Sequence, residues 1–340
     1  MSEHEVSDCT TQVHTIETSV SQRPPDYFRD HLTRNCMPEI VATRQLYEYL
    51  DSIHTTTKIE NFDACKRFGW FVRHVDTGRV KIASRSCKLR WCPLCSNSKK
   101  YLLASETKEW LETVEKPKFL TLTLKHSENE LVNQIDNLYK SFRKLRLMKC
   151  YKKLFKGGVW FFQIKKSDKD DLWHPHLHCV IDSKYIDWTK LWKAWLTITR
   201  SSKVVDIRSV KDPDQVAEYV ARYAARPSDL AKLELPDQLE LVEALHGRRL
   251  VGTWGTARGM SLSPSKPQDA DKWKNVGSWG IIASLFDEDI RAKAIWKAFK
   301  LNDPLNVEDN LQPFEDGWYC EQWKELEKDS SYHQHKFEFT

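Results

Sequence analysis

The stretch "DLWHPHLHCVID", which runs from Asp171 to Asp182, decides the fold of this chain. Three histidines occupy alternate positions in it: His174, His176 and His178. Side chains at i and i+2 of a β-strand point to the same face, so this spacing predicts a strand with its imidazoles on one side. The residues that alternate with them towards the end of the stretch are apolar, as expected for a strand whose other face packs into a core.

The second and third histidines form a candidate metal site. His176 and His178 would stand about 6.5–7 Å apart along a strand, so both imidazoles can bind one ion. A third ligand must come from a neighbouring strand, and Gln163 in "WFFQIKK" is available. His174 precedes Pro175 and is placed at the edge of the strand. A single core histidine is usually structural, whereas a pair at i and i+2 with apolar neighbours favours a metal site.

The segment "DPDQVAEYVARYAARP" predicts a helix that carries two tyrosines. Asp212 is a good N-cap, Pro213 suits the first turn, and Pro227 marks the end. Tyr219 and Tyr223 stand four residues apart, so both hydroxyls can point at the same spot. The alternative is a pair of half-buried aromatic residues that pack the helix against a sheet.

Histidines and tyrosines together suggest phosphoryl transfer. A phenol that attacks a phosphodiester gives a covalent phosphotyrosine ester and releases a 3′-hydroxyl. A bound cation would polarise the phosphate, and the cation and Arg222 would favour the ionised phenol.

The pattern of the central part predicts an α+β fold, with helices packed on an antiparallel or mixed sheet. Strands are expected at 118–125 ("KFLTLTLK"), from 157, across the histidines, from 203 and at 248–255, and helices at 131–145, 187–199, 212–227 and 236–245. In the second of these helices one face carries Trp188, Leu191, Trp192 and Trp195, which we interpret as core.

Three segments in this order, "FLTLTL", "HPHLHCVI" and "YVARY", resemble the motifs of HUH endonucleases, and are most similar to those of the rolling-circle replication initiators (Rep) of small plasmids. The resemblance covers roughly residues 65–255. It implies a ferredoxin/RRM-like antiparallel sheet, metal binding by His176 and His178 without His174, and Mg²⁺ or Mn²⁺ as the catalytic ion.

The resemblance also bears on the nucleophile. It implies a tyrosine C-terminal to the histidines, and the pair resembles the two-tyrosine pattern of single-stranded phage initiators. We therefore predict Tyr223 as the first nucleophile and Tyr219 as its partner, although the order could be reversed. Many relatives carry glutamate where Gln163 stands, and a neutral ligand would weaken a site for a hard cation.

A cysteine cluster lies upstream of these motifs. Cys87, Cys92 and Cys95 occur in "CKLRWCPLC", and Cys65 stands in "FDACKRF". Four thiolates are the number that a structural zinc ion needs, so we predict a Zn²⁺ site. The alternatives are unpaired buried cysteines or a redox C-x-x-C pair, and His74 could replace Cys65.

The net charge of +5 is modest, but it is unevenly distributed. The segment "YKSFRKLRLMKCYKKLFK" contains eight Lys or Arg and no acidic residue. From it we select Arg143, Lys144 and Lys152 as DNA-backbone contacts, together with Arg222 of the tyrosine segment. No apolar window is long enough for a membrane span, so we expect a cytoplasmic protein without a membrane partner.

We expect four regions: an N-terminal extension at 1–55, a Cys-rich zinc-binding module at 56–105, an HUH nicking and joining domain at 115–260, and a mainly helical C-terminal extension at 261–340. The predicted function is a plasmid rolling-circle initiator that nicks an origin and leaves a 3′-hydroxyl primer. Its expected partners are origin DNA, single-stranded at the nick, and a host helicase and polymerase. The alternatives are a two-tyrosine HUH transposase and a non-enzymatic zinc-dependent DNA-binding regulator.

Overall fold

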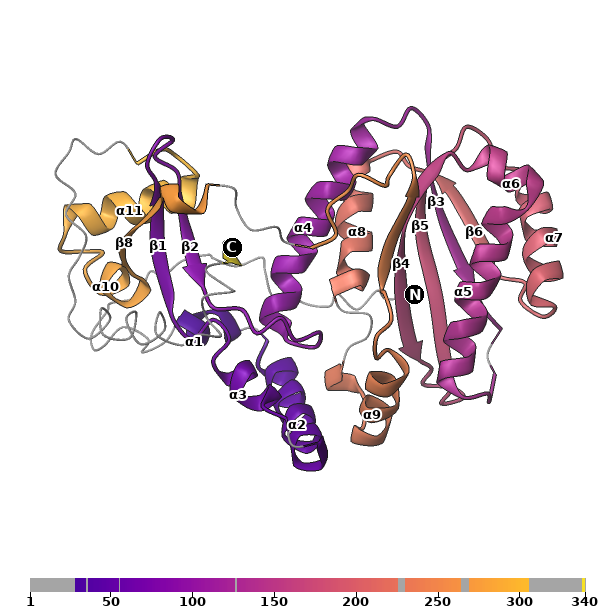
Figure 1. Cartoon of the computed structure of the whole chain (residues 1–340), viewed down its shortest axis with the longest axis horizontal. Helices are drawn as coiled ribbons and strands as arrows, with labels where there is room; N and C mark the ends of the chain where they lie inside the picture. The colour runs from indigo at the N-terminus through magenta and orange to yellow at the C-terminus, as the bar shows by residue number, and fades with distance from the viewer. Residues whose placement is uncertain are drawn as a thin grey trace. The chain divides into compact units, whose positions relative to one another are not determined.

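The computed structural model describes residues 28–34, 36–54, 56–125, 127–225, 230–263, 269–305 and 338–339. The chain divides into two compact units (Figure 1). Unit 1 combines residues 1–95 with 265–340, and unit 2 comprises residues 96–264. No helix in the described ranges is long and apolar enough to cross a lipid bilayer.

Unit 2 is built on a five-stranded sheet with the order β6-β3-β5-β4-β7, in which every neighbouring pair is antiparallel. Its strands are β3 (Pro117–Thr123), β4 (Gly157–Lys166), β5 (Trp173–Asp182), β6 (Val205–Ser209) and β7 (Val251–Gly255). The predicted antiparallel α+β architecture is confirmed, and each strand lies within a few residues of its expected position.

Two helices of unit 2, α7 (Trp188–Thr199) and α8 (Pro213–Ala225), begin at an aspartate that caps the first turn. Asp187 accepts a hydrogen bond from the backbone of Lys190, and Asp212 accepts one from Gln215. The helices are α4 (Pro93–Glu112), which starts just before the unit boundary, α5 (Leu131–Leu147), α6 (Lys149–Leu154), α7 (Trp188–Thr199), α8 (Pro213–Ala225) and α9 (Leu235–Ala244), with a 3₁₀ turn at Leu230–Lys232.

These helices cover both faces of the sheet (Figure 1). On one face α4 and α8 pack on Val159, Phe161 and Val180. On the other face α5 places Tyr139 against Phe162, with 5.7 Å between ring centroids. Each face of the sheet therefore buries one set of alternating side chains.

Unit 1 contains a four-stranded sheet with the order β8-β1-β2-β9. Its strands are β1 (Gly69–His74), β2 (Val80–Ser84), β8 (Trp273–Ser278) and β9 (Glu338–Phe339), and its helices are α1 (Phe28–Thr33), α2 (Met37–His54), α3 (Lys58–Asp63), α10 (Trp279–Ser284) and α11 (Ile290–Leu301), with a 3₁₀ turn at Ala270–Lys272. Aromatic rings fill its core: Phe71 stacks on Trp279 at 5.9 Å and meets Phe299 edge-on at 5.6 Å.

This arrangement differs from the four consecutive regions expected from the sequence. Residues 28–54 form helices that belong to unit 1, and residues 269–301 supply a strand as well as helices to the same unit. The reason is the pairing of β1 with β8, which joins segments about 200 residues apart and leaves no local signal in the sequence.

Candidate active site

The register of three strands brings the motif side chains to one face of the unit 2 sheet. Thr121 of β3 pairs with His178 of β5, and Thr123 pairs with His176. On the other side of β5, Gln163 of β4 pairs with His176. Directly paired residues of antiparallel strands point the same way, so the two histidines, the glutamine and the two threonines share one surface.

His178 is the most tightly held of these side chains. It is buried, with its Nε2 2.7 Å from Oε1 of Gln163 and its Nδ1 3.1 Å from Oγ1 of Thr121. An amide oxygen only accepts, so Nε2 donates to Gln163 and Nδ1 accepts the hydroxyl proton of Thr121. Burial, assisted by the nearby His176 and Lys165, lowers the pKa of His178 to about 3. The imidazole is therefore neutral at physiological pH, which is the form that binds a metal ion.

His176 is only half-buried and is held in the same manner. Its Nδ1 lies 3.0 Å from Oγ1 of Thr123, and its ring centroid is 6.3 Å from that of His178. The first histidine differs, because Nε2 of His174 lies 3.8 Å from the carboxylate of Asp170. The structure thus brings the predicted ligands His176, His178 and Gln163 together, with His174 beside them.

The two threonines were not selected from the sequence as site residues. They alternate with leucines in "FLTLTL", a signal that places both hydroxyls on one strand face. Their partners depend on strand register, which the sequence does not reveal.

Tyr219 lies against the histidines. Its ring meets His178 edge-on at 5.9 Å and Phe119 edge-on at 5.7 Å, and it is 38% exposed. The guanidinium of Arg222 lies 5.9 Å from the Tyr219 ring. The backbone of Tyr223 belongs to the same helix, α8, but its side chain lies outside the described part of the structure. A hydroxyl-bearing side chain of α8 therefore reaches the histidine face.

The predicted DNA contacts of the basic run lie in another layer. Arg143, Lys144 and Lys152 are exposed on α5 and α6, which cover the sheet face opposite the histidines (Figure 1). Of the four basic residues selected from the sequence, only Arg222 lies beside the candidate site.

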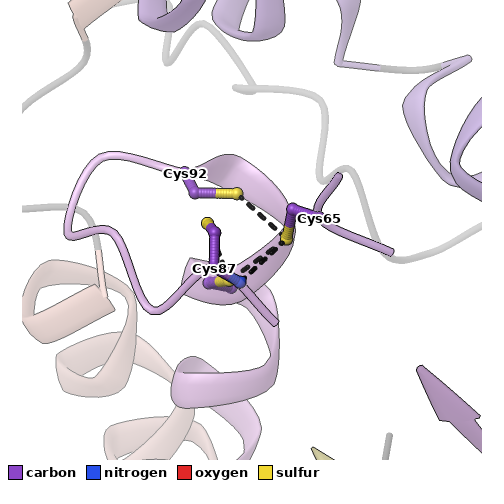
Figure 2. Close-up of side chains that lie close together, drawn as sticks. Cys65, Cys87 and Cys92 are labelled. Carbon is purple, nitrogen blue, oxygen red and sulfur yellow. Dashed lines mark hydrogen bonds between the residues drawn. The ribbon is translucent and has the colours of Figure 1, made fainter. Parts of the chain in front are cut away.

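The four predicted zinc ligands form a separate cluster in unit 1. The sulfur atoms of Cys65, Cys87, Cys92 and Cys95 all lie within 4.8 Å of one another. Individual separations are 3.4 Å between Cys65 and Cys95, 3.5 Å between Cys87 and Cys95, and 3.7 Å between Cys65 and Cys92. Figure 2 shows the sulfurs of Cys65, Cys87 and Cys92 turned towards one another. His74, the alternative ligand, instead binds Asp269 through Nε2 at 2.9 Å.

The geometry of the cluster fits a tetrahedral zinc ion. A Zn–S bond of about 2.3 Å places tetrahedral sulfurs about 3.8 Å apart, close to the observed separations. The backbone N–H of Cys87 also points at the sulfur of Cys65, 3.4 Å away. Hydrogen bonds from the other three cysteines hold the pKa of Cys95 well below its usual range, whereas burial raises the pKa of Cys92. The cluster can thus hold a metal such as zinc.

Comparison with known proteins gives the site its context. A family model described as "Replication protein" matches residues 79–297. The chain belongs to the replication protein family. The match includes the histidine, threonine and tyrosine motifs and three of the four cysteines.

Curated relatives of this replication protein share the description "Protein rep". The protein of Bacillus amyloliquefaciens is 29% identical over 239 residues, which cover 58% of this chain and 70% of the relative. The protein of a Bacillus species is 28% identical over 272 residues, which cover 66% of this chain and 88% of the relative. The protein of Staphylococcus aureus is 29% identical over 185 residues, which cover 48% of this chain and 80% of the relative. No solved structure matches the chain significantly. The resemblance to the Rep initiators of rolling-circle plasmids is confirmed.

Proposed function

We propose that this plasmid replication initiator nicks and rejoins one strand of its origin by tyrosine attack. The observation that carries the proposal is the ring contact of Tyr219 with His178, whose imidazole is in turn hydrogen-bonded to Gln163. A candidate nucleophile and a candidate metal site thus share one sheet face, and the family match agrees with a role at an origin. The same match favours an initiator over a transposase or a regulator without activity.

Three neutral donors would hold the catalytic ion: Nε2 of His176, Nε2 of His178 and Oε1 of Gln163. The amide oxygen is a donor of the kind that Mn²⁺ and Mg²⁺ take, whereas the absence of a carboxylate weakens the site for these hard cations. When bound, the ion polarises the scissile phosphate and neutralises charge that develops on it. Thr121 and Thr123 lie at Nδ1 of the two imidazoles. With an ion at Nε2, the ring proton would lie on Nδ1 and be donated to the threonine oxygen, which would fix the orientation of each ring.

The chemical step is an in-line transfer. The tyrosine oxygen, after losing its proton, forms a bond to phosphorus as the bond from phosphorus to the 3′-oxygen breaks. The 3′-oxygen takes up a proton and becomes the primer end, while the 5′-phosphate stays on the tyrosine. Arg222 beside Tyr219 stabilises the negative phenolate, and reversal of the step rejoins the strand.

We keep Tyr223 as the predicted first nucleophile and Tyr219 as its alternating partner. Residues at i and i+4 of a helix share a face, so the α8 backbone is compatible with both hydroxyls serving one site. The contact of Tyr219 with His178 supports a direct role for this residue.

The cysteine cluster is proposed to bind a structural Zn²⁺ ion through all four sulfurs, which closes the coordination sphere and leaves no open position for substrate. Its task would be to fold unit 1. Recruitment of a host helicase and polymerase belongs to the same proposal.

The test uses the full chain, a single-stranded oligonucleotide from its origin, and Mn²⁺ or Mg²⁺. We expect a protein–DNA adduct that survives SDS, is lost in Tyr223→Phe, and is absent in the double variant with Tyr219→Phe. Tyr101→Phe, a change at an exposed tyrosine of α4, serves as the control. Loss in Tyr219→Phe alone would reverse the order of the tyrosines. An adduct that persists in the double variant would refute the mechanism.

A further inference from the structure

Helix α7 presents aromatic rings to solvent. Trp188 is 51% exposed, and its ring stacks on the half-buried Trp192 with 6.3 Å between centroids and 22° between planes. Its indole N–H donates to the carbonyl oxygen of Val205 at 3.1 Å, which fixes the orientation of the ring. Tyr185, just before the helix, is 74% exposed. We call Tyr185, Trp188 and Trp192 the α7 aromatic surface.

This exposure departs from the sequence interpretation of the helix. One face was expected to pack entirely into the core, and Leu191 and Trp195 are indeed fully buried. The two other tryptophans of that face lie towards its edge and remain accessible. A cluster of large exposed rings is unusual for a soluble surface and marks a place where a partner binds.

The charge around the rings selects a class of partner. Between residues 183 and 205 the chain carries five basic residues and one acidic residue. The basic residues are all exposed: Lys184, Lys190, Lys193, Arg200 and Lys203. The single acid, Asp187, is engaged as the N-cap of α7. Exposed aromatic rings in a segment with an excess of basic residues fit a partner that has both flat apolar faces and negative charge.

We propose that the α7 aromatic surface binds single-stranded DNA, with bases stacked on its rings and phosphates near its lysines. Unpaired bases offer their faces, whereas the bases of a duplex are already stacked on one another. The surface lies in the helix layer opposite α8, so it is distinct from the histidine and tyrosine site (Figure 1). This proposal rests on the proposed function, because nicking supplies the single strand that the surface would hold.

The experiment compares two probes with the full chain. One is a fluorescent thymidine single strand of about 30 nucleotides, and the other is an abasic strand of the same length and charge. We expect the double variant Trp188→Ala/Trp192→Ala to bind the thymidine strand about tenfold or more weakly and the abasic strand unchanged. Trp188→Phe should keep most of the affinity, and Lys190→Gln/Lys193→Gln should weaken both probes. Leu147→Ala, at an equally accessible apolar residue of α5, is the control.

Several outcomes would overturn the proposal. These are an unchanged affinity of the folded tryptophan variant for the thymidine strand, an equal loss for duplex DNA, or a change in oligomeric state by light scattering. If that variant fails to fold, photocrosslinking of single-stranded DNA containing 5-iodouracil to the unaltered chain tests the proposal instead. Adducts must then map to the α7 aromatic surface, and their absence there counts against it. Adduct formation on a short nick-site oligonucleotide should be normal in the tryptophan variant, which separates this proposal from the nicking mechanism.

Discussion

The two units of this initiator each contain an antiparallel sheet, but the sheets are stabilised by different means. The sheet of unit 2 is covered by helices on both faces, and the described strands and helices, from α4 to β7, follow one another along a single stretch of chain. In unit 1, β1 and β2 form a hairpin that pairs with the distant β8, and four cysteines lie in the same unit. We expect unit 2 to rely on its core and unit 1 to rely on a metal ion as well.

The largest effect should follow from removal of that metal. Cys92→Ser, or a strong chelator, should abolish the folding of unit 1, because a zinc ion that closes a four-thiolate site contributes folding free energy directly. Hydrogen exchange measured separately over both units should show loss of protection in unit 1 and retention in unit 2. Cys150→Ser, at an exposed cysteine of unit 2, is the matched control. Equal loss of protection in both units would show that the metal does not stabilise unit 1 selectively.

The complementary substitution changes a candidate metal ligand in unit 2. His178→Ala should lower the rate of adduct formation by about 10³-fold, because the ion that polarises the phosphate loses a ligand. The zinc content, measured by mass spectrometry, should stay at the natural value. The exposed His246 offers a control, since His246→Ala should leave both quantities unchanged. A fall in zinc content after His178→Ala would show that the two metal sites are not independent.

A third change probes the packing at the edge of the unit 2 sheet. Gly255 has a φ of +56°, and a Cβ at this position would lie 1.9 Å from the carbonyl oxygen of Lys156. Gly255→Ala should therefore lower the free energy of unfolding of unit 2 by about 3 kcal/mol. Gly259→Ala places a Cβ in open space and should change the free energy of unfolding by less than about 0.5 kcal/mol. Denaturant titration of both variants provides the measurement, and equal midpoints would contradict the expected strain.

The smallest effect concerns the threonines that orient the imidazoles. Thr121→Val removes the hydroxyl at Nδ1 of His178 and should weaken Mn²⁺ binding by about 10- to 100-fold. Thr121→Ser retains the hydroxyl and should restore most of the affinity. Thr123→Val should weaken Mn²⁺ binding less than Thr121→Val does, because His176 is more exposed than His178. Calorimetric titration with Mn²⁺ distinguishes the variants, and equal affinities of the Val and Ser variants would exclude an orienting role.

Much of unit 2 could be predicted because its signals are local. Alternation of apolar residues marks β3 and β5, and the cap at Asp212 marks α8. The contact between His178 and Gln163 could only be guessed, since it depends on the register of β4 against β5. The contacts of Thr121 and Thr123 with the histidines could not be predicted for the same reason.

Unit 1 was less accessible to prediction. The spacing of its cysteines predicted the cluster, but nothing near β1 indicates that β8 will pair with it. The two accessible tryptophans of α7 were misassigned to the core, because helical periodicity shows that residues share a face but not where the edge of that face lies.

The pairing of β1 with β8 has a consequence for biosynthesis. All four cysteines leave the ribosome before residue 96, so a metal ion can gather them while the rest of the chain is still being made. The sheet of unit 1 is completed only after β8 and then β9 have emerged, and by that time every described strand of unit 2 has been synthesised. The nascent chain would thus assemble unit 2 while unit 1 is unfinished, with the four cysteines gathered early and the unit 1 sheet completed last.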